Sequence, residues 1–117
     1  MPVPVKQVNP VTHTQAINTN SNVNLTVTIG NAQIGSSLVV DNANNVIAKG
    51  DKININLGPG GNLKGRSIII YTNILDVNSI DNGVILVDHF ANVNSFMYVD
   101  TAPQGGIVSF TRQYNFL

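Results

Sequence analysis

Few residues in this sequence could carry out chemistry. The titratable side chains are six aspartates, two histidines, three tyrosines and six lysines or arginines, and the chain contains no glutamate and no cysteine. General acid–base catalysis requires several such groups to converge on one place. Cysteine chemistry is excluded, and no serine lies in a Gly-x-Ser-x-Gly motif. We therefore predict a protein that is not an enzyme, with no catalytic residues and no cofactor.

The two histidines, His13 and His89, are candidate metal ligands. A metal site that uses both would need a third ligand, and the sequence does not nominate one. Asp88 precedes His89, but neighbouring residues of a strand point to opposite faces, so their side chains cannot pair in a regular strand. We predict no metal site at either histidine.

Oxygen-bearing side chains gather in one short segment, at Asp76, Asn78 and Asp81. Oxygen ligands are what Ca²⁺ requires, but the segment lacks glutamate and does not fit the twelve-residue ligand spacing of a helix–loop–helix calcium loop. Aspartate and asparagine are also the residues that tight turns need. We interpret the segment as a turn and keep Ca²⁺ binding as the alternative.

The basic residues are scattered, and the formal net charge is zero. The nearest approach to a cluster is Lys64 with Arg66, beside a glycine-rich loop. Affinity for a phosphate backbone comes chiefly from clustered positive charge, so we predict no nucleic-acid partner. A protein without net charge also lacks electrostatic self-repulsion, which favours an oligomer.

The elements that position these residues are predicted to be strands. The chain contains 18 Asn, 15 Val, 13 Ile and 8 Thr. Valine, isoleucine and threonine pack well on a pleated sheet, while asparagine favours turns over helices. Alternation of apolar and polar residues, clearest from Ser21 to Ile29, supports the same conclusion. The predicted strands are 21–29, 34–40, 46–48, 53–57, 67–77, 84–90, 95–99 and 107–116.

Turn residues separate these strands. Asp41–Asn45 is expected to join two of them, and Asn82-Gly83 is typical of a two-residue hairpin turn in which both residues have positive φ. Segment 67–77 has apolar residues at both odd- and even-numbered positions, so both faces of the strand are apolar. It is therefore expected at the centre of a sheet. The whole pattern predicts an all-β fold, an antiparallel β-sandwich of about seven to nine short strands, either Ig-like or jelly-roll-like. The predicted core consists of Val23, Leu25, Val27, Ile29, Ile53, Ile55, Leu57, Ile68, Ile70, Leu86, Phe90 and Phe110.

Residues 1–11 are predicted to form an extended, proline-containing arm, and 12–117 a single β-sandwich domain. Three prolines fix φ in the arm, which makes it a tail or an edge strand. The first residues also lack the apolar run of a signal peptide, which leaves a cytoplasmic or a mature secreted protein open. No stretch of 18 apolar residues occurs, so we predict no transmembrane helix and no membrane partner.

Function is predicted mainly by exclusion. Scarce catalytic groups and uncharged strand edges favour a non-enzymatic interaction or self-assembly module, with a protein partner or the chain itself. The arm from Pro2 to Val11, or the last strand from Gln113 to Leu117, is expected to take part. The alternative is a carbohydrate-binding module, in which asparagine and aspartate hold a sugar beside an aromatic residue. There is no tryptophan, and Tyr71, Tyr98 and Tyr114 all fall within strand patterns.

Overall fold

Strands make up nearly all the regular structure of the computed structural model, which describes residues 3–117. Within that range the one helical element is η1 (Gly60–Asn62), a single 3₁₀ turn. Met1 and Pro2, which belong to the predicted arm, lie outside the described residues.

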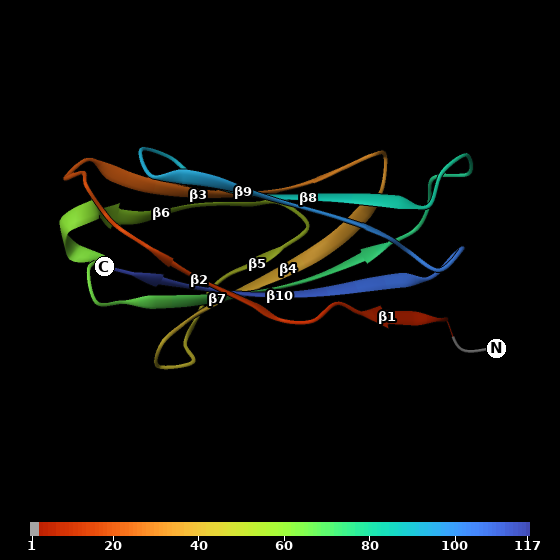
Figure 1. Ribbon diagram of the computed structural model, residues 1–117, viewed down its shortest axis with the longest axis horizontal. Coiled ribbons are helices and arrows are strands. Elements are labelled where there is room, and N and C mark those ends of the chain that lie inside the picture. The colour runs from red at the N-terminus through yellow and green to blue at the C-terminus, as the bar shows by residue number, and fades with distance from the viewer. Residues whose placement is uncertain (1–2) are drawn as a thin grey trace.

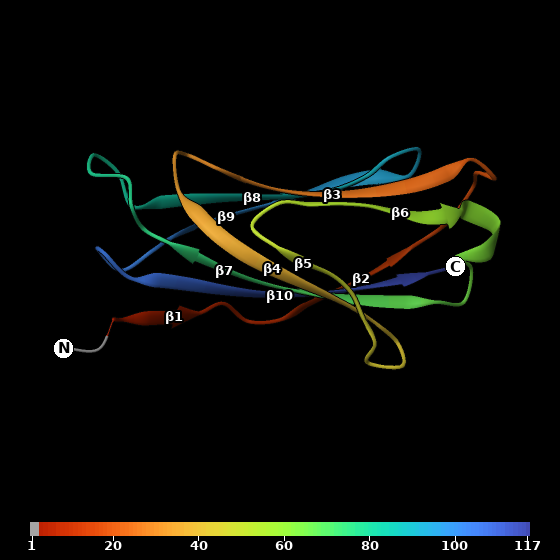
Figure 2. The same cartoon turned by 180° about the vertical axis from the view of Figure 1, so that it is seen from behind.

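Within the described residues, ten strands form two sheets that pack face to face (Figures 1 and 2). Sheet A has the order β1-β10-β7-β4-β5, with β2 also paired to β10, and sheet B has the order β6-β3-β8-β9. The strands of sheet A are β1 (Val5–Gln7), β2 (Val11–Gln15), β4 (Ile34–Asp41), β5 (Val46–Gly50), β7 (Ser67–Leu75) and β10 (Ile107–Phe116). Those of sheet B are β3 (Asn22–Gly30), β6 (Ile53–Pro59), β8 (Gly83–Phe90) and β9 (Asn94–Thr101). The predicted all-β sandwich is confirmed.

The proline-containing segment pairs with the last strand. β1 and β2 both run parallel to β10 along the same edge, and every other strand pair is antiparallel. Backbone hydrogen bonds from Ile107 to Pro4 and from Val8 to Ser109 hold the first part of the segment. These two strands have no long alternating pattern, and they raise the number of strands to ten.

Alternation in the sequence becomes alternation in burial. Along β10, every even-numbered side chain is buried and every odd-numbered one is half-buried. As predicted, β7 lies at the centre of its sheet, between β10 and β4. Nine of the twelve predicted core residues are buried, and the other three, Ile29, Ile55 and Leu57, are partly buried and pack against the core.

The predicted hairpin at Asn82-Gly83 is wrong. β7 and β8 belong to different sheets, and neither Asn82 nor Gly83 has positive φ. The segment between them crosses from sheet A to sheet B, where the Gln33 side chain donates to the carbonyls of Asp81 and Gly83. By contrast, Asp41–Asn45 does join the paired strands β4 and β5, and Asn44 there has φ 62°.

Candidate functional site

A buried ion pair between Arg112 and Asp88 links the two sheets. Arg112 extends inward from β10 of sheet A, and Asp88 extends inward from β8 of sheet B. The guanidinium binds the carboxylate in a bidentate manner, with Nε 2.8 Å from Oδ2 and Nη2 2.6 Å from Oδ1. Both side chains have 0% relative exposure. A buried charge is tolerated when it is paired and hydrogen-bonded in this way.

Neighbouring polar groups complete this network. The Tyr114 hydroxyl donates to Asp88 Oδ2 at 2.5 Å and also hydrogen-bonds the Tyr98 hydroxyl at 2.8 Å. Nη1 of Arg112 donates to the hydroxyl of Thr72 at 2.8 Å, and that hydroxyl lies 2.7 Å from Ser37 Oγ. Burial and the adjacent carboxylate of Asp88 raise the pKa of Tyr114 far above its ordinary value of 10.0, so its hydroxyl keeps its proton. The network therefore holds the sheets together, with Arg112, Asp88 and Tyr114 fully enclosed between them.

Sequence reasoning missed this network, although it had a signal. Arg112 falls at an inward position of an otherwise apolar strand, and Asp88 does the same in β8. Two opposite charges at inward positions of separate strands indicate a buried ion pair. The prediction that Asp88 and His89 face opposite ways is confirmed, because Asp88 is buried and His89 is exposed.

The two histidines lie in different surroundings. His13 on β2 points inward, with its ring 4.6 Å from that of Phe96 and 5.5 Å from that of Tyr114. His89 faces the outside of sheet B, with Nδ1 2.5 Å from the hydroxyl of Ser95. The structure does not bring the two together, and residues 3–117 contain no group of three potential His or carboxylate metal ligands.

The segment 76–82 uses its oxygens within the protein. Asp76 accepts hydrogen bonds from the side chain of Gln33 and the backbone N–H of Gly105. Asn78 Oδ1 accepts from two backbone N–H groups of its own turn, and Asp81 Oδ1 accepts from that of Gly83. A surface pocket of about 230 Å³ lies over this segment. These bonds explain the segment as a turn that crosses between the sheets.

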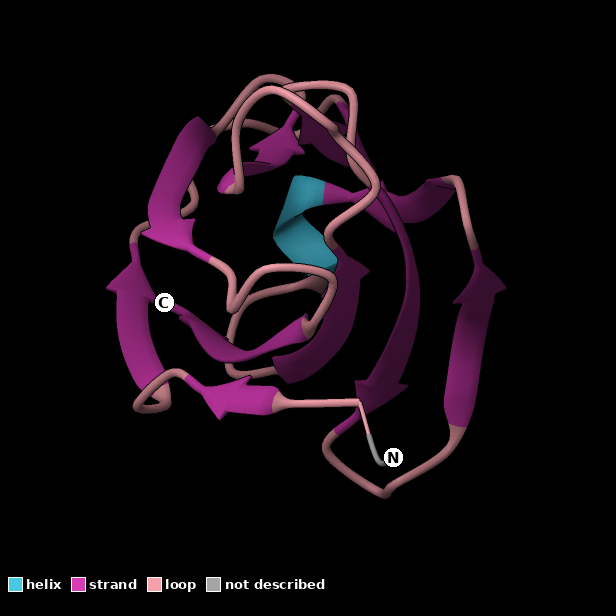
Figure 3. Cartoon of the chain, turned by 90° about the vertical axis from the view of Figure 1, so that its right-hand side faces the viewer, coloured by secondary structure: helices cyan, strands magenta, loops and turns pink. Residues whose placement is uncertain are grey.

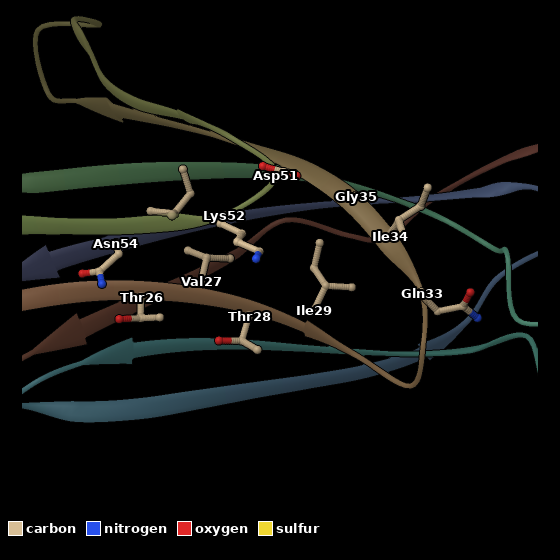
Figure 4. Close-up of a pocket in the computed structure, with 11 residues that line it drawn as sticks. Thr26, Val27, Thr28, Ile29, Gln33, Ile34, Gly35, Asp51, Lys52 and Asn54 are labelled. Atoms are coloured by element: carbon tan, nitrogen blue, oxygen red, sulfur yellow. The ribbon is translucent and has the colours of Figure 1, made fainter.

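A larger pocket, of about 440 Å³, lies where the edges of the two sheets are incomplete (Figure 4). β6 begins opposite Val27 and β5 ends opposite Ser37, so the last residues of β3 and the first of β4 have no outer neighbour. Figure 4 shows Ile29 pointing from β3 into the space below β4. Four aliphatic side chains and six polar or charged ones line the pocket, with Asp51 and Lys52 at one end, and the lining offers no pair of carboxylates for catalysis.

The outer faces of the sandwich carry the exposed side chains. On sheet B, Ile85 and Val87 of β8 lie opposite Val99 and Met97 of β9. Met97 and Val99 are 68% and 66% exposed. On sheet A, Tyr71 of β7 is 42% exposed, whereas Tyr114 is buried and Tyr98 is half-buried, and their hydroxyls hydrogen-bond each other.

Comparisons with protein-family models, with curated proteins and with solved structures find no match to this chain.

The two basic residues that come closest to a cluster in the sequence, Lys64 and Arg66, are both exposed and lie in the connection between η1 and β7. No helix in the described part of the chain is long and apolar enough to cross a membrane.

Proposed function

We propose that this chain is a non-enzymatic interaction module that assembles through its sheets. The observation that carries the proposal is the patch on the outer face of sheet B formed by Ile85, Val87, Met97 and Val99, which we call the β8–β9 patch. Exposed, contiguous aliphatic surface costs free energy in water, and on soluble proteins it commonly marks a site of protein contact.

Charge supports the same function. The outward-facing residues of β8 and β9 include no Lys, Arg or Asp, and the whole chain has zero net charge. A partner therefore meets no like charge to repel it and no ammonium or carboxylate to desolvate. The deeply buried charges, Arg112 and Asp88, satisfy each other inside the sandwich, which leaves them no part in surface chemistry.

Light scattering of the purified chain tests this function. We expect a mass above the 12.5 kDa of one copy at roughly tens of micromolar. A strict monomer at every concentration would overturn self-assembly.

A carbohydrate-binding module is the second candidate, favoured by the exposed ring of Tyr71. Its cross-strand neighbours are Thr111 and Leu38, and the hydroxyl of nearby Ser109 donates to Asn73 Oδ1. An aromatic ring beside hydroxyl and amide groups suits the apolar face and the hydroxyls of a sugar. Calorimetric titration with a panel of sugars tests this candidate: binding that Tyr71→Ala abolishes and Met97→Ala preserves would support it.

A further inference from the structure

The free edge of β9 has a defined set of unpaired backbone groups. Ala102 donates its N–H to the carbonyl of Asn82, which continues the pairing of β8 with β9. Because backbone groups two residues apart point to the same side of a strand, the even-numbered residues of β9 face β8. The odd-numbered residues, Ser95, Met97, Val99 and Thr101, therefore direct their N–H and C=O groups to the free edge.

The N–H groups at both ends of this edge are satisfied within the chain. The N–H of Ser95 donates to Asn94 Oδ1, and the N–H of Thr101 donates to Asp100 Oδ1. Lys6 reaches the carbonyl of Thr101 at 3.5 Å. In residues 3–117 no hydrogen bond joins the free-edge groups of Met97 and Val99 to another part of the chain. The centre of β9 therefore presents two N–H and two C=O groups without an intramolecular partner.

Nothing in this centre protects the edge from pairing. Natural edge strands are usually guarded by lysine, proline, a bulge or covering structure. Segment 96–99 contains neither a charged residue nor a proline, and the pairing of β8 with β9 is regular throughout. The one nearby charged pair, Lys6 with Asp100, is mutually neutralised at the end of the strand.

We propose that two copies of this chain pair through their β9 strands, antiparallel and about a two-fold axis at Tyr98. In this register, Met97 of each copy lies opposite Val99 of the other, and each such pair exchanges two hydrogen bonds. All the bare groups at the centre of both strands are then satisfied. The two four-stranded sheets become one continuous eight-stranded sheet.

This register also places aliphatic surface against aliphatic surface. Met97 and Val99 project from the same outer face, so the β8–β9 patches of the two copies meet across the new strand pair. Cross-strand aliphatic pairs of this kind stabilise sheets. The pairing is self-complementary, as a closed two-fold dimer requires, and this identifies a second copy as the occupant.

The last strand, which the sequence also predicted as a contact segment, is less suited to edge pairing. β10, which includes Gln113–Phe116, already has β7 on one side and β1 and β2 on the other. Figure 3 views the molecule along its longest axis, and in that projection the strands surround the single helical turn. The free edges of β3 and β4 are each only about three residues long before β6 or β5 begins. β9 is an eight-residue strand with no strand hydrogen-bonded to its outer side, and side chains of β1 and β2 form hydrogen bonds only with its ends, at Asn94, Asp100 and Thr101.

A charge-exchange experiment tests the register, and it rests on the proposed function only in requiring self-association. One variant carries Met97→Lys with Val99→Lys, and a second carries Met97→Asp with Val99→Asp. Each alone places like charges directly opposite each other twice, so each is expected to be a 12.5 kDa monomer in light scattering. Mixed in equal amounts, they place Lys opposite Asp and are expected to restore the dimer.

The matched control is Ile34→Lys with Val46→Lys, which changes two side chains on sheet A that are each 56% exposed. It is expected to keep the mass of the parent chain, and circular dichroism verifies that every variant is folded. A parent chain that is monomeric overturns the proposed function together with this pairing. If the parent chain and the Lys variant both associate, the β9 pairing alone is overturned. A mixture of the Lys and Asp variants that stays monomeric, when the parent chain associates, has the same consequence.

Discussion

Residues 3–117 contain two ion pairs of nearly equal length in opposite surroundings. Arg112 and Asp88 lie 2.6 Å apart with no solvent exposure, whereas Lys6 and Asp100 lie 2.5 Å apart with side chains 47% and 22% exposed. Both join sheet A to sheet B, the first through the core and the second at the edge where β1 meets β9. Distance alone therefore says little about what an ion pair contributes.

Solvent makes the difference between the two pairs. Removing one partner of a buried pair leaves an uncompensated charge in a medium that cannot solvate it. Water and salt solvate the remaining charge of an exposed pair, so its loss costs little. We expect the interior pair to determine whether the sandwich folds, and the edge pair to affect only how the amino-terminal strand lies against β9.

The largest effect is expected from Asp88→Ala, which leaves Arg112 buried without its partner. The free energy of unfolding should fall by about 3–5 kcal/mol, measured by urea denaturation. Replacing both residues with apolar side chains, Asp88→Leu with Arg112→Met, should recover much of that loss. A loss below about 1 kcal/mol in the single variant would show that Asp88 is solvated.

Leu25→Ala and Ile55→Ala extend the same contrast to apolar side chains. Leu25 is fully buried, so its truncation should cost about 2–5 kcal/mol, and half-buried Ile55 should cost less. The two residues lie directly opposite each other on β3 and β6, which makes them a matched pair. If the two variants lost equal free energy of unfolding, measured by heat or urea, the difference in burial between Leu25 and Ile55 would be contradicted.

Tyr114→Phe removes a hydroxyl that serves both Asp88 and Tyr98, and it should destabilise the fold by about 1–3 kcal/mol. The raised pKa of Tyr114 also predicts a pH dependence: its contribution is complete below the unfolded value of about 10 and is lost as the pH rises above that value. In the phenylalanine variant this part of the alkaline loss should disappear. An identical alkaline profile for the two proteins would refute the assignment.

The smallest effect is expected from Lys6→Ala, at about 0–1 kcal/mol, because the pair is partly exposed. The hydrogen bond from Lys6 lowers the pKa of Asp100 below its ordinary 3.8. This contribution is therefore present above pH 3.8 and is lost as the pH falls through the lower folded-state pKa. Acid titration of the parent and Lys6→Ala chains measures this contribution to the free energy of unfolding. If Lys6→Ala cost as much unfolding free energy as Asp88→Ala, the contrast between the exposed and the buried ion pair would be refuted.

Sequence by itself determined eight of the ten strands described in residues 3–117. Alternation of apolar and polar side chains with a period of two is a local property of the sequence. The alternation in 107–116 therefore predicted β10 with both of its ends. Segment 67–77, which is apolar at both odd- and even-numbered positions, predicted a central strand. The abundance of β-branched residues and asparagine likewise determined an all-β chain with polar turns. Few titratable residues also limited what any site could contain.

Tertiary structure alone decided which strands became neighbours. Asn82-Gly83 has the composition of a hairpin turn, but β7 and β8 pack in different sheets because each has its own long-range partners. The same long-range pairing placed Arg112 of β10 against Asp88 of β8, 24 residues apart, and left the centre of β9 without an outer neighbour. Local propensity acts over a few residues, whereas pairing and burial depend on contacts between segments far apart in the chain, and no single segment encodes them.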